Sequence, residues 1–259
     1  MTFLEEVVER KKQELRIRKS RVVLEEMKKT IRDLPPSRDM LQALSKRGEM
    51  ALVAEIKKAS PSAGVIRESF DPEGLARSYE RGGASAISVL TEVHFFRGEI
   101  FHLGMVKGAV SLPILQKDFI IDPYQVYEGR ASGADALLLI SSILGKSHLA
   151  ELVGLTESLR MVPWVEVHDE QDLEKISGLS LPLVGINNRN LRQLSVNLMN
   201  TLHLIKKIPG VTIVISESGI ENREDVSILK RAGVKGILVG EVLMRAADPA
   251  AKITELLGL

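Results

Sequence analysis

The chain has 259 residues, of which 44% are hydrophobic, so it can bury a large core. Its 35 lysine and arginine residues nearly balance 34 aspartate and glutamate residues, and the net charge of +1 gives no general attraction to nucleic acid or to an anionic membrane. The absence of cysteine excludes disulfides, thiolate metal sites and a cysteine nucleophile, and it fits the cytoplasm, where we expect the protein to function.

Residues 1–50 precede the first predicted strand, and we expect them to form an N-terminal helical extension. Their apolar residues recur at helical spacing among many charges, which predicts amphipathic helices that cap the rest of the fold. We interpret the basic cluster from Arg16 to Arg21 as a solvated face rather than a nucleic-acid site. The start of the chain is too polar for a signal peptide, and the apolar runs are too short for a membrane span.

Eight short apolar runs follow, and each is followed by a polar segment with helical periodicity. The predicted strands are residues 51–56, 86–90, 113–116, 136–140, 162–167, 183–186, 211–215 and 236–239. Strands that are apolar along their whole length are typical of a parallel sheet buried on both faces. With no linker in between, eight such units predict an α/β fold, a (β/α)8 TIM barrel forming one domain over residues 1–259. No glycine-rich dinucleotide fingerprint follows the first strand, which disfavours an open doubly wound sheet.

Polar residues cluster where these strands end, and the C-terminal ends of barrel strands carry the catalytic groups. In the first strand, Glu55 and Lys57 are two residues apart and should point to the same face. Charged residues are rarely buried unless they are paired, so a ring of them at one mouth indicates a site. The polar ends are Glu55 and Lys57, Thr91-Glu92, Lys117-Asp118, Ser141-Ser142, Glu166, Asn187 and Arg189, Glu217 and Ser218, and Gly240-Glu241.

The last two strand ends indicate a phosphate site. Ser218-Gly219 and Gly240-Glu241 each precede a helical segment, where glycine lets backbone N–H groups approach an anion and a helix N-terminus adds partial positive charge. Barrels commonly bind phosphate after strands seven and eight. Glycines that only permit tight turns would leave the same pattern, but two together favour a phosphorylated ligand.

Four segments at the strand ends form a set: AEIKKASPS at Ala54–Ser62, LQKDFIID at Leu115–Asp122, GINNRNL at Gly185–Leu191 and SESGI at Ser216–Ile220. In this order they resemble those of the indole-3-glycerol phosphate synthase family of tryptophan biosynthesis. The resemblance covers essentially the whole chain. It implies a decarboxylating lyase that closes the indole ring of 1-(2-carboxyphenylamino)-1-deoxyribulose 5-phosphate with loss of carbon dioxide and water. No metal or other cofactor is expected. We expect a monomer, with association with other tryptophan-pathway enzymes left open.

Matched residue by residue, the resemblance makes Lys117 the general acid of ring closure and Lys57 a second lysine in contact with the substrate. Glu166 would be a base or electrostatic stabiliser, and Glu55 would help to position Lys117. We expect the nearby cation of Lys57 to lower the pKa of Lys117 toward working pH. Glu217 and Ser218 match the strand-seven pair of the family, with Glu217 among the catalytic residues and Ser218 next to the phosphate. The sequence leaves open which of Lys57, Lys117, Glu55 and Glu166 moves which proton.

The remaining matches concern substrate binding. Ser60, Phe96, Arg189 and Ser218 fall where the family contacts its substrate, with Phe96 beside the anthranilate ring and Arg189 near its carboxylate, for which a guanidinium is well shaped. Asn187 matches a ligand of the substrate's polar centre. Two residues depart from the family pattern. Ala63 stands where many relatives have a basic residue. Trp164 stands where they tend to have an aliphatic one, and we interpret it as core packing.

Two other functions fit the same strand ends. A Schiff-base aldolase-type barrel would use Lys117 or Lys57 as an amine nucleophile. A phosphosugar-binding barrel would use only the phosphate site and lack this catalysis. Phosphoribosylanthranilate isomerase shares the barrel and the phosphate site, but its proton shuttle would need a cysteine, which this chain lacks.

Overall fold

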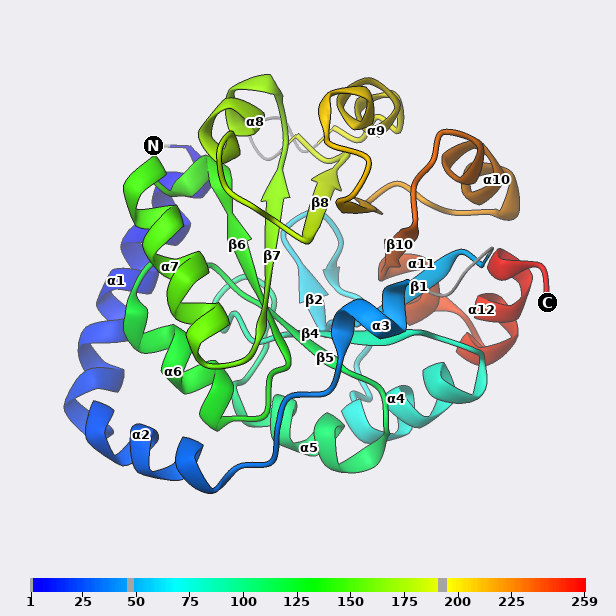
Figure 1. The fold of residues 1–259 in the computed structure, drawn as a ribbon. Helices are drawn as coiled ribbons and strands as arrows, with labels where there is room; N and C mark the ends of the chain where they lie inside the picture. The colour runs from blue at the N-terminus through cyan, green and yellow to red at the C-terminus, as the bar shows by residue number, and fades with distance from the viewer. Residues whose placement is uncertain (1, 46–48, 191–194) are drawn as a thin grey trace.

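Eight parallel strands close into a barrel in the computed structural model, which describes residues 2–45, 49–190 and 195–259 (Figure 1). Each strand pairs with the next one in the chain, and the last pairs with the first. This confirms the predicted (β/α)8 TIM barrel. The strands are β1 (Ala51–Ile56), β4 (Ala86–Leu90), β5 (Ile114–Lys117), β6 (Ala136–Ile140), β7 (Val162–Val167), β8 (Leu183–Asn187), β9 (Ile213–Glu217) and β10 (Gly236–Val239).

Helices follow every barrel strand and form the outer layer. Side-chain oxygens cap five of them at Asp71, Asp122, Asp169, Asn222 and Asp248, each accepting from a backbone N–H of the first turn. These caps fix where the helical segments after the strands begin. The elements are α4 (Pro72–Arg81), α5 (Phe101–Ala109), α6 (Pro123–Ala131), η1 (Ser141–Ile143), α7 (Lys146–Ser158), α8 (Glu170–Ile176), α9 (Met199–Leu204), η2 (Ile205–Lys207), α10 (Arg223–Arg231), α11 (Glu241–Arg245) and α12 (Pro249–Leu257).

Two apolar cores hold the barrel together. One fills the space between the strands and the surrounding helices. The other fills the barrel interior with residues such as Val53, Leu115, Leu183 and Ile215, together with the fully buried Trp164. The interior is therefore a packed core, as is usual for this fold. None of the helices in the described ranges is long and apolar enough to cross a membrane.

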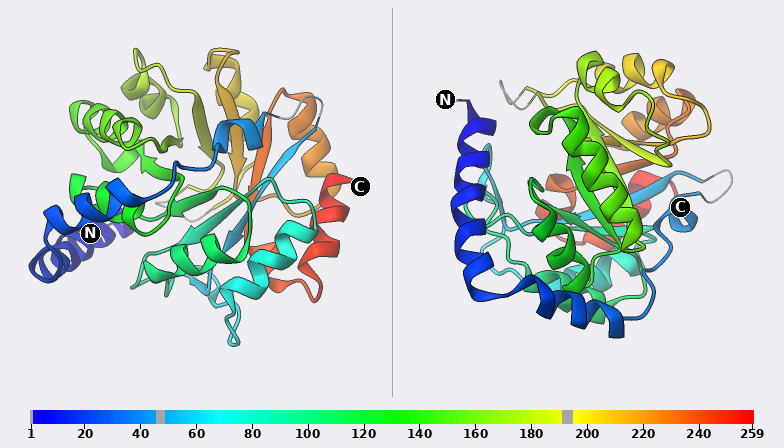
Figure 2. Two further views of the ribbon diagram at one scale, coloured as in Figure 1. Left: turned by 60° about the horizontal axis from the view of Figure 1, so that its bottom comes forward. Right: turned by 60° about the vertical axis from the view of Figure 1, so that its left-hand side comes forward.

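The N-terminal segment forms α1 (Phe3–Arg21), α2 (Leu24–Asp33) and α3 (Met40–Leu44). Helix α1 runs along the outside of the barrel, and α2 packs against α6 (Figure 2). Lys11 is almost completely buried and lies 2.9 Å from the carboxylate of Asp118. Arg18 pairs with Glu128 of α6 at 2.8 Å, so the predicted solvated face from Arg16 to Arg21 is wrong at this position. Ion pairs with the barrel bury one side of the basic cluster.

The structure moves the predicted bounds of β5 and β8 by one residue and those of β9 by two, and it adds a hairpin. Strand β9 starts at Ile213 instead of Val211, because Pro209 and Thr212 form a turn that leaves Val211 almost fully exposed. The strand then continues to Glu217, which pairs in register with Asn187. A short hairpin of β2 (Ala59–Ser60) and β3 (Gly64–Val65) follows β1 and was not predicted.

Candidate active site

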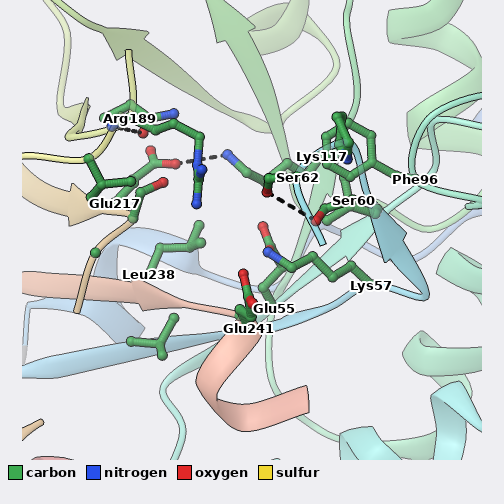
Figure 3. Close-up of a pocket in the computed structure, with 18 of the residues that line it drawn as sticks. Glu55, Lys57, Ser60, Ser62, Phe96, Lys117, Arg189, Glu217, Leu238 and Glu241 are labelled. Atoms are coloured by element: carbon green, nitrogen blue, oxygen red, sulfur yellow. Dashed lines mark hydrogen bonds and ion pairs between the residues drawn. The ribbon is translucent and has the colours of Figure 1, made fainter. Parts of the chain in front are cut away.

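A cavity of about 470 Å³ opens at the C-terminal ends of the strands (Figure 3). This volume is within the usual range for small-molecule sites. Every site residue predicted from the sequence lines it. They are Glu55, Lys57, Ser60, Phe96, Lys117, Glu166, Asn187, Arg189, Glu217, Ser218, Gly219, Gly240 and Glu241.

Lys117 lies at the centre of the charged cluster. Its Nζ donates to Oε2 of Glu217 at 2.8 Å and to Oε2 of Glu166 at 3.1 Å. Burial alone would lower the pKa of this ammonium, but the carboxylates of Glu217, Glu166 and Glu55 together raise it above its ordinary value. The predicted lowering by Lys57 is therefore wrong, because the anions around Lys117 outweigh the neighbouring cation. Lys117 is held charged in the pocket.

The two carboxylates around Lys117 have different surroundings. Burial would raise the pKa of Glu166, but this carboxylate lies between two cations, Lys117 and His168, which lower its pKa well below the usual range. The cation in contact with Glu217 is Lys117. Burial, with the charge of Glu166 adding to it, outweighs this cation and raises the pKa of Glu217 to about 7. The pKa values of the two carboxylates are therefore shifted in opposite directions.

His168 supports Glu166 from behind. Its Nε2 lies 3.2 Å from Oε1 of Glu166, and its Nδ1 lies 3.4 Å from a carboxylate oxygen of Asp172. Burial would lower the pKa of the imidazole, but Asp172 and Glu166 raise it to about 10. The imidazolium thus fixes one oxygen of Glu166 and leaves the other for Lys117.

The raised pKa of His168 predicts a pH-dependent stability. Folding raises the pKa of His168 from about 6.5 to about 10. The charged imidazole therefore contributes its full share to the free energy of unfolding below about pH 6.5, and this share is lost as the pH rises through about 10. We expect the free energy of unfolding, measured by urea denaturation between pH 6 and pH 10, to fall by a few kcal/mol, at about 1.4 kcal/mol per pKa unit. The variant His168→Asn should flatten this slope, with His203→Asn as the exposed-histidine control. A wild-type slope retained in His168→Asn would contradict the assignment.

Glu55 and Lys57 form the opposite wall. They project to the same face at the end of β1, as predicted, and Nζ of Lys57 lies 2.7 Å from Oε1 of Glu55. The direct partner of Glu55 is therefore Lys57, whereas its effect on Lys117 acts through the pocket at longer range. Lys57 and Glu55 thus face Lys117 and Glu217 across the cavity (Figure 3).

The end of β8 brings Asn187 and Arg189 to the same pocket. Oδ1 of Asn187 accepts the backbone N–H of Arg189 at 2.9 Å, which orders this turn. The next residue, Asn188, points the other way, and its amide donates to Oγ of Ser216 and to the backbone oxygens of Glu217 and Ser218. Asn188 therefore fixes the strand end that carries Glu217. Leu191, the last residue of the third sequence segment, lies outside the described residues.

The expected phosphate site forms the far end of the cavity. Ser218 and Gly219 both have left-handed backbones, with φ of 67° and 77°. Such consecutive residues turn their N–H groups toward one concave side, which suits an anion. Gly240 and Glu241 face them at the start of α11. The Glu241 carboxylate pairs with Arg245 at 3.0 Å, so only the backbone of Glu241 suits phosphate.

Phe96 is held in the pocket by a buried carboxylate. Glu92 accepts three backbone N–H groups, from His94 at 2.9 Å, Phe95 at 2.7 Å and Phe96 at 3.0 Å. These bonds fix the loop after β4 so that the aromatic ring faces the cavity. The polar end of this strand thus has a supporting role.

Other predicted polar ends serve the scaffold instead of the site. Thr91 does not line the cavity but donates at 2.7 Å to Asp118, which does. Ser141 is buried in η1 and, with Ser142, does not line the cavity. The sequence reasoning missed Phe3, Ser62 and Arg245, which do line it. Only Ser62, inside the first family segment, carried a signal that could have indicated it.

We searched the described residues for groups of at least three histidine, cysteine, aspartate or glutamate side chains able to hold a metal ion, and found none.

Comparisons with known proteins agree with this geometry. The family model described as indole-3-glycerol phosphate synthase matches residues 4–256. Indole-3-glycerol phosphate synthases from two strains of Acidithiobacillus ferrooxidans are 45% identical over 257 residues, covering 98% of this chain and 98% of each relative.

Similar solved structures show the same fold at low identity. Thiamine phosphate pyrophosphorylase from Pyrococcus furiosus superposes with a TM-score of 0.60 and 16% identity over 84% of this chain and 96% of that chain. A 3-hexulose-6-phosphate synthase gives a TM-score of 0.66 and 18% identity over 81% of this chain and 99% of that chain.

Proposed function

The chain belongs to the indole-3-glycerol phosphate synthase family, and we propose how its pocket carries out the reaction of that family. The activity is that of a decarboxylating carbon–carbon lyase in tryptophan biosynthesis. It converts 1-(2-carboxyphenylamino)-1-deoxyribulose 5-phosphate into indole-3-glycerol phosphate, carbon dioxide and water. The observation that carries the residue assignment is the position of Lys117, in direct contact with two buried carboxylates at the base of the cavity.

The substrate is bound at its two ends. Its phosphate lies against the backbone N–H groups of Ser218, Gly219, Gly240 and Glu241, where both strand ends face the cavity. Its anilino ring lies at the other end beside Phe96. The ring carboxylate meets the cations of Lys57 and Arg189, and Ser60 contacts the substrate from the hairpin after β1. This arrangement places the ketone above Lys117.

Ring closure forms a bond between the ring carbon that carries the carboxylate and the ketone carbon. The π electrons of the ketone move to its oxygen, which takes a proton from the ammonium of Lys117. The raised pKa of Lys117 does not prevent this transfer, because the developing alkoxide is a much stronger base than the amine. Glu166 and Glu217 hold the ammonium in place, and Asn187 binds the substrate's polar centre.

Two losses complete the reaction. Carbon dioxide leaves with its bonding pair returned to the ring system. The hydroxyl formed from the ketone then departs as water, with a proton from Lys57. A carboxylate of the cluster takes a proton from the methylene carbon next to the nitrogen, and the electron pair of that C–H bond forms the double bond of the indole. We assign that base role to Glu166, which the imidazolium of His168 holds ionised, and a positioning role to Glu55 through its ion pair with Lys57.

The phosphate assignment predicts a charge-specific effect at Ser218. Asparagine and aspartate both tolerate its left-handed backbone, so Ser218→Asn and Ser218→Asp differ mainly in charge. We expect KM of the aspartate variant to exceed that of the asparagine variant by roughly fivefold or more, since a carboxylate a few ångströms from phosphate repels it by about 1 kcal/mol or more even when screened. Steady-state kinetics at low and high salt checks this, and equal KM values would move the phosphate elsewhere.

The protein works as a cytoplasmic monomer in this proposal, and its partner is the phosphorylated small molecule rather than nucleic acid or membrane. All residues of the proposed site come from one chain, so the site does not require association with other tryptophan-pathway enzymes and is compatible with it. Light scattering at micromolar concentration tests the monomer.

The direct test of the function is an assay with the carboxyphenylamino-deoxyribulose phosphate. Indole fluorescence should appear together with one carbon dioxide per turnover. A protein that binds the substrate without forming indole would be a phosphosugar-binding barrel. Trapping of the protein by borohydride with the substrate would instead indicate an aldolase-type Schiff base at Lys117 or Lys57.

A further inference from the structure

Trp164 is buried beneath the charged cluster and makes one polar contact with it. Its indole Nε1 donates to Oε1 of Glu217 at 2.8 Å, and the side chain is fully shielded from solvent. The sequence alone indicated only core packing for this residue. A buried indole N–H needs a partner, and here that partner is a carboxylate of the site.

The contact spans an intervening strand. Trp164 is on β7 and Glu217 on β9, with β8 between them. The interior position of β8 at this level is Gly185, and a Cβ there would collide with both Nε1 of Trp164 and Oε1 of Glu217. The missing side chain of Gly185 therefore lets the indole reach across β8. The large side chain of Trp164 thus fills the space that Gly185 leaves open.

The indole and the Lys117 ammonium bind different oxygens of the Glu217 carboxylate. Trp164 binds Oε1. Lys117 binds Oε2 at 2.8 Å (Figure 3). Glu166 is arranged in the same way, with His168 on one oxygen and Lys117 on the other. Each carboxylate thus has one fixed support and offers its second oxygen to the ammonium.

We propose that Trp164 is a positioning residue of the reaction, acting through Glu217 to aim the Lys117 ammonium at the substrate ketone. This inference rests on the proposed function of Lys117. The hydrogen bond from the indole N–H is stronger to an ionised carboxylate than to a neutral one. Trp164 therefore also favours the charged form of Glu217. The other charged groups around Glu217 in the described residues are Lys117 and Glu166, with His168 behind Glu166, Glu55 beyond Lys117, and Arg189 on the same wall.

The variant Trp164→Phe keeps an aromatic ring and removes the donor. We expect kcat to fall about tenfold with KM changed less than about threefold, and the acidic limb of kcat to move up by about one pH unit, because a hydrogen bond to a charged group is lost. Leu183→Val is the matched control, since it loosens the same interior core without touching a polar group. In the Glu217→Gln background, Trp164→Phe should cost less than about twofold.

Equal losses in Trp164→Phe and Leu183→Val, with the acidic limb unmoved, would overturn the proposal and leave Trp164 as core packing. A second measurement needs neither substrate nor a Trp164 variant. Trp164 is the single tryptophan of the chain, so its emission in the free enzyme should titrate near neutral pH and lose this step in Glu217→Gln. A step retained in Glu217→Gln would contradict the contact. If the protein formed no indole, the emission titration would still test the contact separately from the function.

Discussion

Replacing Lys117 by alanine should lower kcat by roughly 100- to 10,000-fold, the usual contribution of a general acid. The reason is that the ketone oxygen then receives its proton from water instead of from an ammonium fixed by Glu166 and Glu217. KM should change far less, since Lys57, Arg189 and the phosphate loops still bind the substrate. Steady-state kinetics with the carboxyphenylamino-deoxyribulose phosphate measures both.

Stability needs its own control, because Lys117→Ala leaves two buried carboxylates without their shared cation. We expect a lower free energy of unfolding in Lys117→Ala, and its partial recovery in the double variant Lys117→Ala/Glu217→Gln, which removes one of the two charges. Turnover should not recover with it. A Lys117→Ala enzyme that keeps more than about a tenth of wild-type kcat, a loss under about 1.4 kcal/mol, would show that Lys117 is not the acid.

Glu166→Gln should give the second largest loss, again roughly 100-fold or more if Glu166 is the base of the last step. It should also move the acidic limb of the pH profile. Glu217 must be ionised to hold Lys117, and its pKa is raised by burial and by the charge of Glu166. Removing that charge lowers the pKa of Glu217, so the limb shifts to lower pH, opposite to the shift expected for Trp164→Phe.

The pH dependence of kcat from pH 5 to pH 10, in wild type and Glu166→Gln, tests this. Because the pKa of Lys117 is raised, the wild-type profile should show no alkaline limb from this lysine within that range. Full activity with an unmoved acidic limb in Glu166→Gln would leave Glu166 as a structural ion pair and transfer the base role to Glu55 or to water.

The barrel itself was predictable because its signals are local. Each apolar run is followed by a segment with helical periodicity, and Asp71, Asp122 and Asn222 each mark a helix start within the sequence. The strand ends were predictable for the same reason, since parallel strands of a closed sheet present their ends at one mouth. The boundary of β9 was missed because the apolar Val211 belongs to a turn.

The pairing within the site was not predictable. The pKa of Lys117 depends on three carboxylates from β1, β7 and β9, which are far apart in the sequence and meet only in the folded barrel. Gly185 gives no sign in the sequence that its missing side chain lets Trp164 reach Glu217. Likewise, the burial of Lys11 against Asp118 depends on how α1 lies on the barrel. Such contacts follow from tertiary geometry rather than from local pattern.

The most direct test of the account is a crystal structure of Lys117→Ala with the intact substrate, which this variant should turn over too slowly to consume. The account predicts phosphate against the backbone of Gly219 and Gly240, the anilino ring beside Phe96, and the ketone oxygen facing the space vacated by the Lys117 side chain. A ketone oxygen that points away from position 117 and contacts Lys57 would contradict it, and would make Lys57 the acid of ring closure.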